Sequence, residues 1–198
     1  RVLEHALFNA GVPYRVYGGM RYFERAEVKH ALAYLRLIAA PGDDGAFLRV
    51  VNTPSRGIGE VAQGQLLEAA RATGVDYVDL LVDEARRPKL KGTAAKGAVA
   101  LASLLRWLRE APDRPVAALL QEIVALTGFE RHLTEAFGEA EGDDRMDNVR
   151  ELIGDANDFD VTHPDAGLEL FLQERALVQD ADDAGAERAD AISLMTLH

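Results

Sequence analysis

Residues 43–74 read DDGAFLRVVNTPSRGIGEVAQGQLLEAARATG, two helical patterns separated by a short turn. The paired aspartates suit the start of a helix over 45–52, because an aspartate side chain accepts hydrogen bonds from first-turn amides. The turn at 53–59 contains one proline and two glycines, which interrupt regular structure. A second helix is predicted over 60–73, with Gly74 as its stop. This arrangement indicates a mainly α-helical fold.

Helical periodicity continues on both sides of this stretch. Apolar residues recur three and four positions apart over 26–40, which predicts a long amphipathic helix. Further helices are predicted at 1–10, 76–86, 93–110, 115–127, 129–137, 144–157 and 166–178. The stretch 181–190 is rich in alanine and aspartate and is predicted to be a linker.

Two β-like segments lie near opposite ends of the sequence. Val12, Tyr14 and Val16 alternate with other residues before Gly18, which predicts a short strand. Residues 191–197, AISLMTL, are apolar and compatible with a second strand. The simplest interpretation is a helical domain inserted into an α/β domain, with a short piece of the host at each end.

Composition narrows the class of protein. The chain has 198 residues, of which 48% are hydrophobic and 28% charged, as in soluble globular domains. It contains no cysteine, which excludes disulfides, thiolate zinc sites and cysteine nucleophiles. No apolar run approaches the roughly 18 residues of a membrane span, and the N-terminal residues do not resemble a signal peptide. The cytoplasm is therefore the predicted compartment.

The net charge of −11 conceals an asymmetry between the two halves. Residues 1–110 carry 16 basic and 12 acidic side chains, a net of +4, whereas residues 111–198 carry 6 and 21, a net of −15. An anion-binding surface is therefore predicted in the first half. The acidic half is expected to face solvent or a partner, and ordinary surface charge is the alternative interpretation.

The sequence RGIG at 56–59 is the sharpest candidate site. Glycines let a backbone approach a ligand closely, and the amides at the start of the following helix favour phosphate. Arg56 could add a bidentate contact, and Arg49 lies one or two turns away. This is the logic of a helix–hairpin–helix element, which holds duplex backbone without reading its sequence. A purely structural glycine turn is the alternative.

Three other segments have both a functional and a structural interpretation. A second glycine turn at 127–129 lies in acidic surroundings, which favours a plain helix cap. The basic run 86–96 could touch phosphate or could form a solvated face. In segment 18–29, cations alternate with Tyr22 and Phe23, a composition that suits single-stranded nucleic acid. The alternative there is that Phe23 belongs to the core.

No catalytic constellation can be assembled. The histidines lack metal-ligand spacing, and the phosphate-binding pattern G-x-x-x-x-G-K-[ST] is absent. The chain by itself is predicted to be non-catalytic and to hold no metal.

Five segments in one order carry a family resemblance. They are GVPYRVYGGMRYFERAEVKHALAYLRLI, DDGAFLRVVNTPSRGIG, RMDNVREL, FLQERALV and ISLMTLH. Together they closely resemble the UvrD/Rep/PcrA group of superfamily 1 DNA helicases. The first and last segments are highly specific, whereas 75–125 is generic helix.

The resemblance implies an ATP-driven motor that moves 3′ to 5′ on single-stranded DNA. Its two RecA-like motor domains, 1A and 2A, each carry a helical insertion, 1B and 2B. Residues 1–20 would be a piece of 2A, 21–188 the 2B domain, and 189–198 a return to 2A at the start of helicase motif V. ATP and Mg²⁺ are implied for the full-length protein, with no cofactor in this fragment.

The resemblance also implies roles for particular residues. Duplex backbone contacts are expected from Thr53, Arg56, Gly57, Ile58 and Gly59. Contacts to single-stranded DNA are expected from Arg21, Thr196 and His198, and hinge motion from Gly18 and Gly19. Motif V continues in the family beyond the position of His198, where this sequence stops.

The implied partners are DNA at a single-strand/duplex junction and the motor domains of the same helicase, with repair or transcription proteins as further candidates. The implied location is the bacterial cytoplasm, in association with the nucleoid. A second hypothesis is an acidic docking module that binds such proteins rather than DNA.

Overall fold

The computed structural model describes residues 7, 10, 12, 14–17, 22–110, 114–185 and 192–195, with backbone only for 14–17, 177–185 and 193–195. Their order is β1 (Tyr14–Tyr17), η1 (Tyr22–Glu24), α2 (Ala26–Ala39), α3 (Asp44–Val50), α4 (Glu60–Thr73), α5 (Tyr77–Val82), α6 (Gly92–Arg109), α7 (Val116–Thr127), α8 (Phe129–Phe137), α9 (Glu139–Thr162), α10 (Leu168–Gly185) and β2 (Ile192–Met195). The fold is mainly helical, as predicted.

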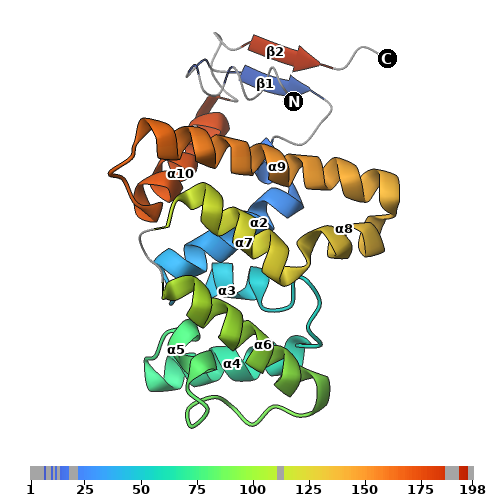
Figure 1. Ribbon diagram of the computed structural model, residues 1–198, viewed down its shortest axis with the longest axis vertical. Helices are drawn as coiled ribbons and strands as arrows, with labels where there is room; N and C mark the ends of the chain where they lie inside the picture. Colours follow the sequence, from blue (N-terminus) through green and yellow to red (C-terminus); the bar gives the residue numbers. More distant parts are fainter. Residues whose placement is uncertain are drawn as a thin grey trace.

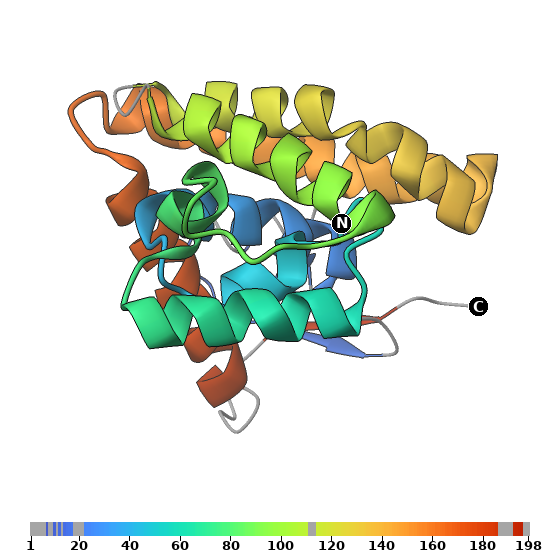
Figure 2. The same cartoon turned by 90° about the horizontal axis from the view of Figure 1, so that it is seen from below.

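The helices are stacked along the long axis of the molecule. The two strands lie at one end, with α9 and α10 next to them, and α4, α5 and α6 form the opposite end (Figure 1). Helices α2, α3 and α7 lie between these groups. Figure 2 shows the α4–α6 end face on, with α4 running across the front. The RGIG turn therefore belongs to the half of the molecule farther from the strands.

The two strands pair with each other although they come from opposite ends of the sequence. They run parallel, with Tyr14 opposite Ile192 and Tyr17 opposite Met195. Parallel neighbours need a crossover connection between them, and here the whole helical body is that connection. Each of the two predicted β segments thus contains a four-residue strand.

The core runs through α2, whose apolar face is buried along its length. Leu32, Tyr34, Leu35 and Leu37 are each at most 3% exposed and belong to one continuous cluster that reaches α3 through α7. A smaller cluster of Phe129, Leu133, Met146 and Val149 joins α8 to α9. The 3.6-residue period in the sequence of 26–40 predicted this packing correctly.

Helix α9 is tied to α2 by a buried polar network. Glu27, which is 3% exposed, accepts hydrogen bonds from Arg145 (3.0 Å) and from the Asn148 side chain (2.7 Å). Asn148 in turn accepts from Arg25, and its carbonyl accepts from the Tyr22 hydroxyl at 2.8 Å. Buried charge of this kind is tolerated only when it is fully hydrogen-bonded.

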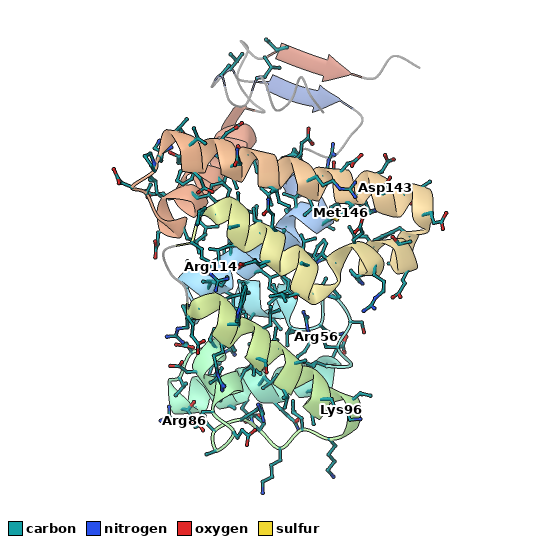
Figure 3. All side chains as sticks on the ribbon, in the orientation of Figure 1. Arg56, Arg86, Lys96, Arg114, Asp143 and Met146 are labelled. Atoms are coloured by element: carbon teal, nitrogen blue, oxygen red, sulfur yellow. The ribbon has the colours of Figure 1, made fainter. Side chains whose placement is uncertain are left out.

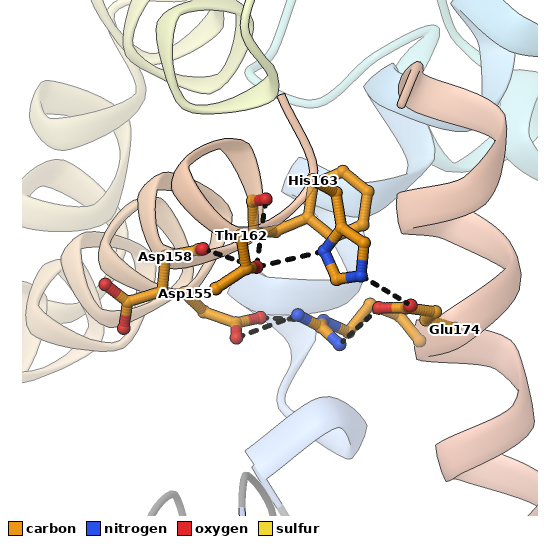
Figure 4. Close-up of polar contacts among 7 residues, drawn as sticks. Asp155, Asp158, Thr162, His163 and Glu174 are labelled. Atoms are coloured by element: carbon orange, nitrogen blue, oxygen red, sulfur yellow. Dashed lines mark hydrogen bonds and ion pairs between the residues drawn. The ribbon is translucent and has the colours of Figure 1, made fainter. Parts of the chain in front are cut away.

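A second buried pair ties α9 to α10. Arg175 donates to both oxygens of Asp155, at 2.7 and 2.9 Å, and contacts Glu174 at 3.7 Å (Figure 4). His163, at the end of α9, lies 4.0 Å from Glu174 on the same side. Helix α9 therefore holds both α2, which follows β1, and α10, which precedes β2.

Several predicted boundaries were confirmed and others were wrong. Asp43 caps α3 by accepting from the Ala46 amide at 2.9 Å, and Gly74 ends α4 at φ +66°. The predicted helix 76–86 stops at Val82, because Asp83 and the arginines after it form a turn.

The predicted lengths of α9 and α10, in the acidic half of the chain, were too short. Helix α9 covers Glu139–Thr162 rather than 144–157, and the linker predicted at 181–190 is helical as far as Gly185. Charged and alanine-rich segments lack the apolar period that marks a helix, although alanine and glutamate form helices readily. Residues 186–190 lie outside the described part of the chain. Among the described residues, no helix is both long enough and apolar enough to cross a membrane.

Candidate nucleic-acid interface

The RGIG turn joins α3 to α4. Its four residues differ in their exposure to solvent. Ile58 is fully buried, whereas Gly57 and Gly59 are exposed. Gly57 adopts φ +70°, a conformation that favours glycine. A Cβ added at Gly57 would also lie 2.8 Å from the Thr93 side chain of α6. The turn is therefore anchored by Ile58 and restricted to glycine at 57.

Two of the turn's amides are bound inside the protein. The Asn52 side-chain oxygen accepts from the Arg56 amide at 2.8 Å and from the Ile58 amide at 3.1 Å. In the described part of the chain, the amides of Gly57 and Gly59 have no acceptor. The turn thus presents alternate N–H groups that are available to an external anion.

The same groups lie at the N-terminus of α4. Gly59 is the residue before the helix, and no side chain caps the first turn. The first amides of an α-helix have no intrahelical partner and carry the positive end of its dipole. Glu60 lies in this turn and opposes part of that positive field.

An open groove of about 580 Å³ runs from this helix end to the start of α6. Gly59, Glu60 and Val61 line one side, and Lys89, Lys91 and Ala94 line the other. No described carboxylate lies within 4.0 Å of either lysine ammonium, whereas Arg86 and Arg87 of the same basic run are paired with Asp83 and Glu84. Arg86 and Lys96 mark this end of the molecule in Figure 3. The sequence shows the basic run, but it does not show that Lys89 and Lys91 line the same groove as Gly59.

Arg56 has a different position from the one expected. Its guanidinium donates to the carbonyl oxygens of Val50 (2.8 Å) and Pro54 (3.1 Å), and to the hydroxyl of Tyr34. Tyr34 is fully buried and donates to the Thr53 carbonyl at 2.6 Å. The expected bidentate contact from Arg56 to phosphate therefore finds no support in this geometry, because the guanidinium points into the protein.

A second basic cavity lies between α2 and α3. Its volume is about 220 Å³, and Lys29, Arg36 and Arg49 line it together with Asp43. Burial, followed by the nearby charge of Arg49, lowers the pKa of His30 to about 4. His30 is therefore neutral at pH 7; burial is the main cause of its lowered pKa, and the charge of Arg49, which lines the cavity, adds to it.

The aromatic residues of segment 18–29 are core residues. Tyr22 and Phe23 are 6% and 3% exposed and contact each other edge to face. Stacking of bases on these two rings is therefore excluded in this conformation. The alternative reading of Phe23 as a core residue is confirmed.

Five predicted residues lie outside the described part of the chain. They are Gly18, Gly19, Arg21, Thr196 and His198. The second glycine turn is described, and Gly128 ends α7 at φ +68° as a plain cap.

Potential metal-ligating side chains are not clustered in the part of the chain that the structure describes. It contains no group of three or more histidine, aspartate or glutamate side chains able to hold a metal ion. The sequence also lacks a phosphate-binding loop of the G-x-x-x-x-G-K-[ST] type. We therefore derive no step through ATP or Mg²⁺ from this chain.

Comparisons with known proteins agree on one family. The model of the "UvrD-like helicase C-terminal domain" matches residues 1–198. Similar proteins include "ATP-dependent DNA helicase UvrD1" of Mycobacterium tuberculosis (36% identity over 214 residues), "DNA helicase II" of Escherichia coli (39% over 211) and "ATP-dependent DNA helicase PcrA" of Bacillus subtilis (32% over 207). Each alignment covers 100% of this chain but only 27–28% of the relative. The chain belongs to the UvrD-like helicase C-terminal domain family.

Proposed function

We propose that this chain is the duplex-binding and regulatory part of an ATP-dependent 3′–5′ DNA helicase acting in DNA repair or replication. Residues 21–188 would form the helical 2B domain, and 1–20 and 189–198 would belong to the RecA-like 2A domain. The pairing of β1 with β2 supports this division, because the strand before the helices and the strand after them belong to one sheet. The names of the relatives, which are DNA helicases, support DNA as the ligand.

The observation that carries the proposal is the groove between α4 and α6. It combines the amide of Gly59, an uncapped helix N-terminus, and the ammonium groups of Lys89 and Lys91, which have no ion-pair partner among the described residues. The Gly57 amide lies two residues earlier in the same turn. All of these favour an anion, and none of them recognises a base edge. A sugar–phosphate backbone that is bound without regard to sequence fits this set.

The expected affinity is weak. A lysine about 4 Å from a phosphate gains only about 1 kcal/mol in water, and an exposed helix N-terminus contributes about 0.3–1 kcal/mol. Non-specific duplex binding of this kind has a Kd of about 10⁻⁴ to 10⁻⁶ M at physiological salt. The motor domains of the same helicase would supply the rest of the affinity.

We propose the cavity between α2 and α3 as a second basic site for the same DNA. Lys29 and Arg49 line it, and no described carboxylate forms an ion pair with either side chain. Thr53 and Ile58 contribute through the shape of the turn, since Ile58 is buried and the Thr53 carbonyl accepts from Tyr34.

In the whole protein, the helical domain would rotate relative to the motor domains about hinges near Gly18, Gly19 and residue 189. Arg21, Thr196 and His198 would contact single-stranded DNA beside those hinges. ATP hydrolysis would be carried out by parts of the protein outside this chain, in the cytoplasm and near the nucleoid.

A salt titration with matched variants tests this proposal. We expect Lys91→Glu to weaken binding of a tailed duplex about tenfold and to reduce the slope of log K against log salt by about one unit. The control is Arg131→Glu, which makes the same charge change at a 79% exposed position on α8. Fluorescence anisotropy at several salt concentrations measures both. Equal losses in the two variants, or no change in either, would contradict the assignment of the groove.

The acidic docking module remains the alternative, and one observation favours it. Asp143, Asp147 and Glu130 surround Arg150 on the exposed side of α8 and α9, far from the groove. Figure 3 marks Asp143 at the α9 end of the molecule. Retention of a basic protein by the nuclease-treated chain, without any binding of duplex, would support this function instead.

A further inference from the structure

Asn52 lies where one side chain can decide which amides of the turn face a ligand. Its amide oxygen accepts from Arg56 N at 2.8 Å and from Ile58 N at 3.1 Å, using both of its lone pairs. The amides of Gly57 and Gly59 alternate with these two, and they are the ones that have no acceptor in the described chain.

We propose that Asn52 is the positioning residue of the phosphate-binding turn, because it holds two amides inward and thereby leaves those of Gly57 and Gly59 for DNA. This inference rests on the proposed function of the groove. Asn52 itself would not touch the ligand.

The turn is braced from three other elements. From α2, Tyr34 contacts the Arg56 guanidinium, and from the end of α3 the Val50 carbonyl accepts from it. From α6, Gly97 approaches so closely that a Cβ there would lie 2.1 Å from the Arg56 carbonyl oxygen. Arg56 therefore acts inside the protein, and the contact with Gly97 links the turn to the helix that starts beside Lys91.

The choice of an amide over a carboxylate at position 52 also follows. Aspartate could accept the same two hydrogen bonds, but it would place a negative charge directly behind the proposed phosphate site. Asn52→Asp should therefore keep the turn's conformation and still weaken DNA binding, whereas Asn52→Ala should lose the conformation as well.

Amide hydrogen exchange on the full 198-residue chain tests the inference without any substitution. We expect the Arg56 and Ile58 amides to be protected in the free protein, and those of Gly57 and Gly59 to exchange rapidly until a tailed duplex is added. Protection of Gly57 and Gly59 before DNA is added would overturn the inference.

Variants complete the test by anisotropy and NMR with the same duplex. We expect Asn52→Ala to weaken binding about tenfold, the range for loss of one charge-assisted hydrogen bond, and to abolish the response of Gly57 and Gly59. In Asn52→Asp the free-protein signals of Arg56 and Ile58 should match the unaltered chain, which a general loss of stability would not produce.

Two failures can be told apart. If the unaltered chain binds, Lys91→Glu weakens it, and Asn52→Ala keeps full affinity and salt slope, the role of Asn52 is wrong and the proposed function survives. If the unaltered chain does not bind the duplex at all, both are wrong. If Asn52→Ala does not fold, the exchange pattern and Asn52→Asp still decide the question.

Discussion

The turn between α3 and α4 and the turn between α7 and α8 use the same glycine geometry, with φ +70° at Gly57 and +68° at Gly128. Each is followed by a helix whose first turn has no side-chain cap. Around the first turn, Lys89 and Lys91 have no described ion-pair partner, whereas beside the second turn Arg131 pairs with Glu135 at 3.8 Å. The positive glycine φ is thus common to both turns, and the surrounding charge distinguishes a candidate phosphate site from a plain cap.

The largest expected effect concerns Gly97 of α6, which packs against Arg56 of the RGIG turn. Gly97→Ala would push a methyl group against the Arg56 carbonyl oxygen, and overpacking against backbone costs about 1–3 kcal/mol; we expect the upper end here, since the contact would be 2.1 Å. Urea unfolding measures the change. The control is Gly64→Ala in α4, where nothing lies within 4 Å and alanine should stabilise the helix by about 0.5–1 kcal/mol. Equal stabilities for the two variants would show that α6 does not clamp the turn.

The next effect compares the two glycines directly. Gly57→Ala meets both positive φ and the Thr93 side chain at 2.8 Å, so we expect a loss of about 2–3 kcal/mol in unfolding free energy. Gly128→Ala meets positive φ alone, with its nearest neighbour the flexible end of Arg131 at 3.4 Å, and should lose about 1–2 kcal/mol. Only the change at Gly57 should also weaken duplex binding. A loss of DNA affinity in Gly128→Ala would remove the distinction between the turns.

The smallest expected effect concerns the pKa values of two histidines, His30 and His132. Burial and then Arg49 lower the pKa of His30 to about 4, whereas for His132 burial lowers the pKa and Glu135 opposes that shift. Because the unfolded chain binds a proton at His30 near pH 6.5 and the folded chain does not until about pH 4, stability should fall as pH drops through that window. His30 is partly exposed, so we expect only about 1–2 kcal/mol.

Titration of the ring protons by NMR checks this prediction. The pKa of His30 should lie below that of His132, and Arg49→Ala should raise the pKa of His30 without moving that of His132. An unchanged pKa of His30 in Arg49→Ala would show that the α2–α3 cavity is less positive than its lining residues imply.

Much of this fold could be predicted from local sequence, because local rules decide where helices start and stop. The helices on either side of the RGIG turn, the Asp43 cap and both strands follow from periodicity and capping residues. The full length of α9 could not be predicted, since its ends are acidic and its contact with α8 depends on Gly142 packing against Thr134.

The candidate site likewise has features that local sequence predicts and features that only the folded chain determines. Glycine spacing identified Gly57 and Gly59, but the direction of the Arg56 side chain depends on Tyr34, which lies 22 positions earlier and meets it only in the folded chain. Asn52 was missed, although an asparagine four residues before Arg56 in a turn is a signal for side-chain to backbone bonding.

Site-directed cross-linking tests the central claim most directly, because the chain contains no cysteine of its own. Val61 on the groove rim and Val161 near the end of α9 are matched in chemistry and exposure, at 79% and 73%. Single Val61→Cys and Val161→Cys variants would each be mixed with a tailed duplex that carries a mixed-disulfide tether on one backbone phosphate, so that the cysteine thiolate forms the cross-link by displacing the small thiol of the tether. We predict disulfide formation several-fold faster at position 61, with the difference reduced by high salt. Equal rates, or faster reaction at position 161, would contradict the assignment of duplex binding to the α4–α6 groove.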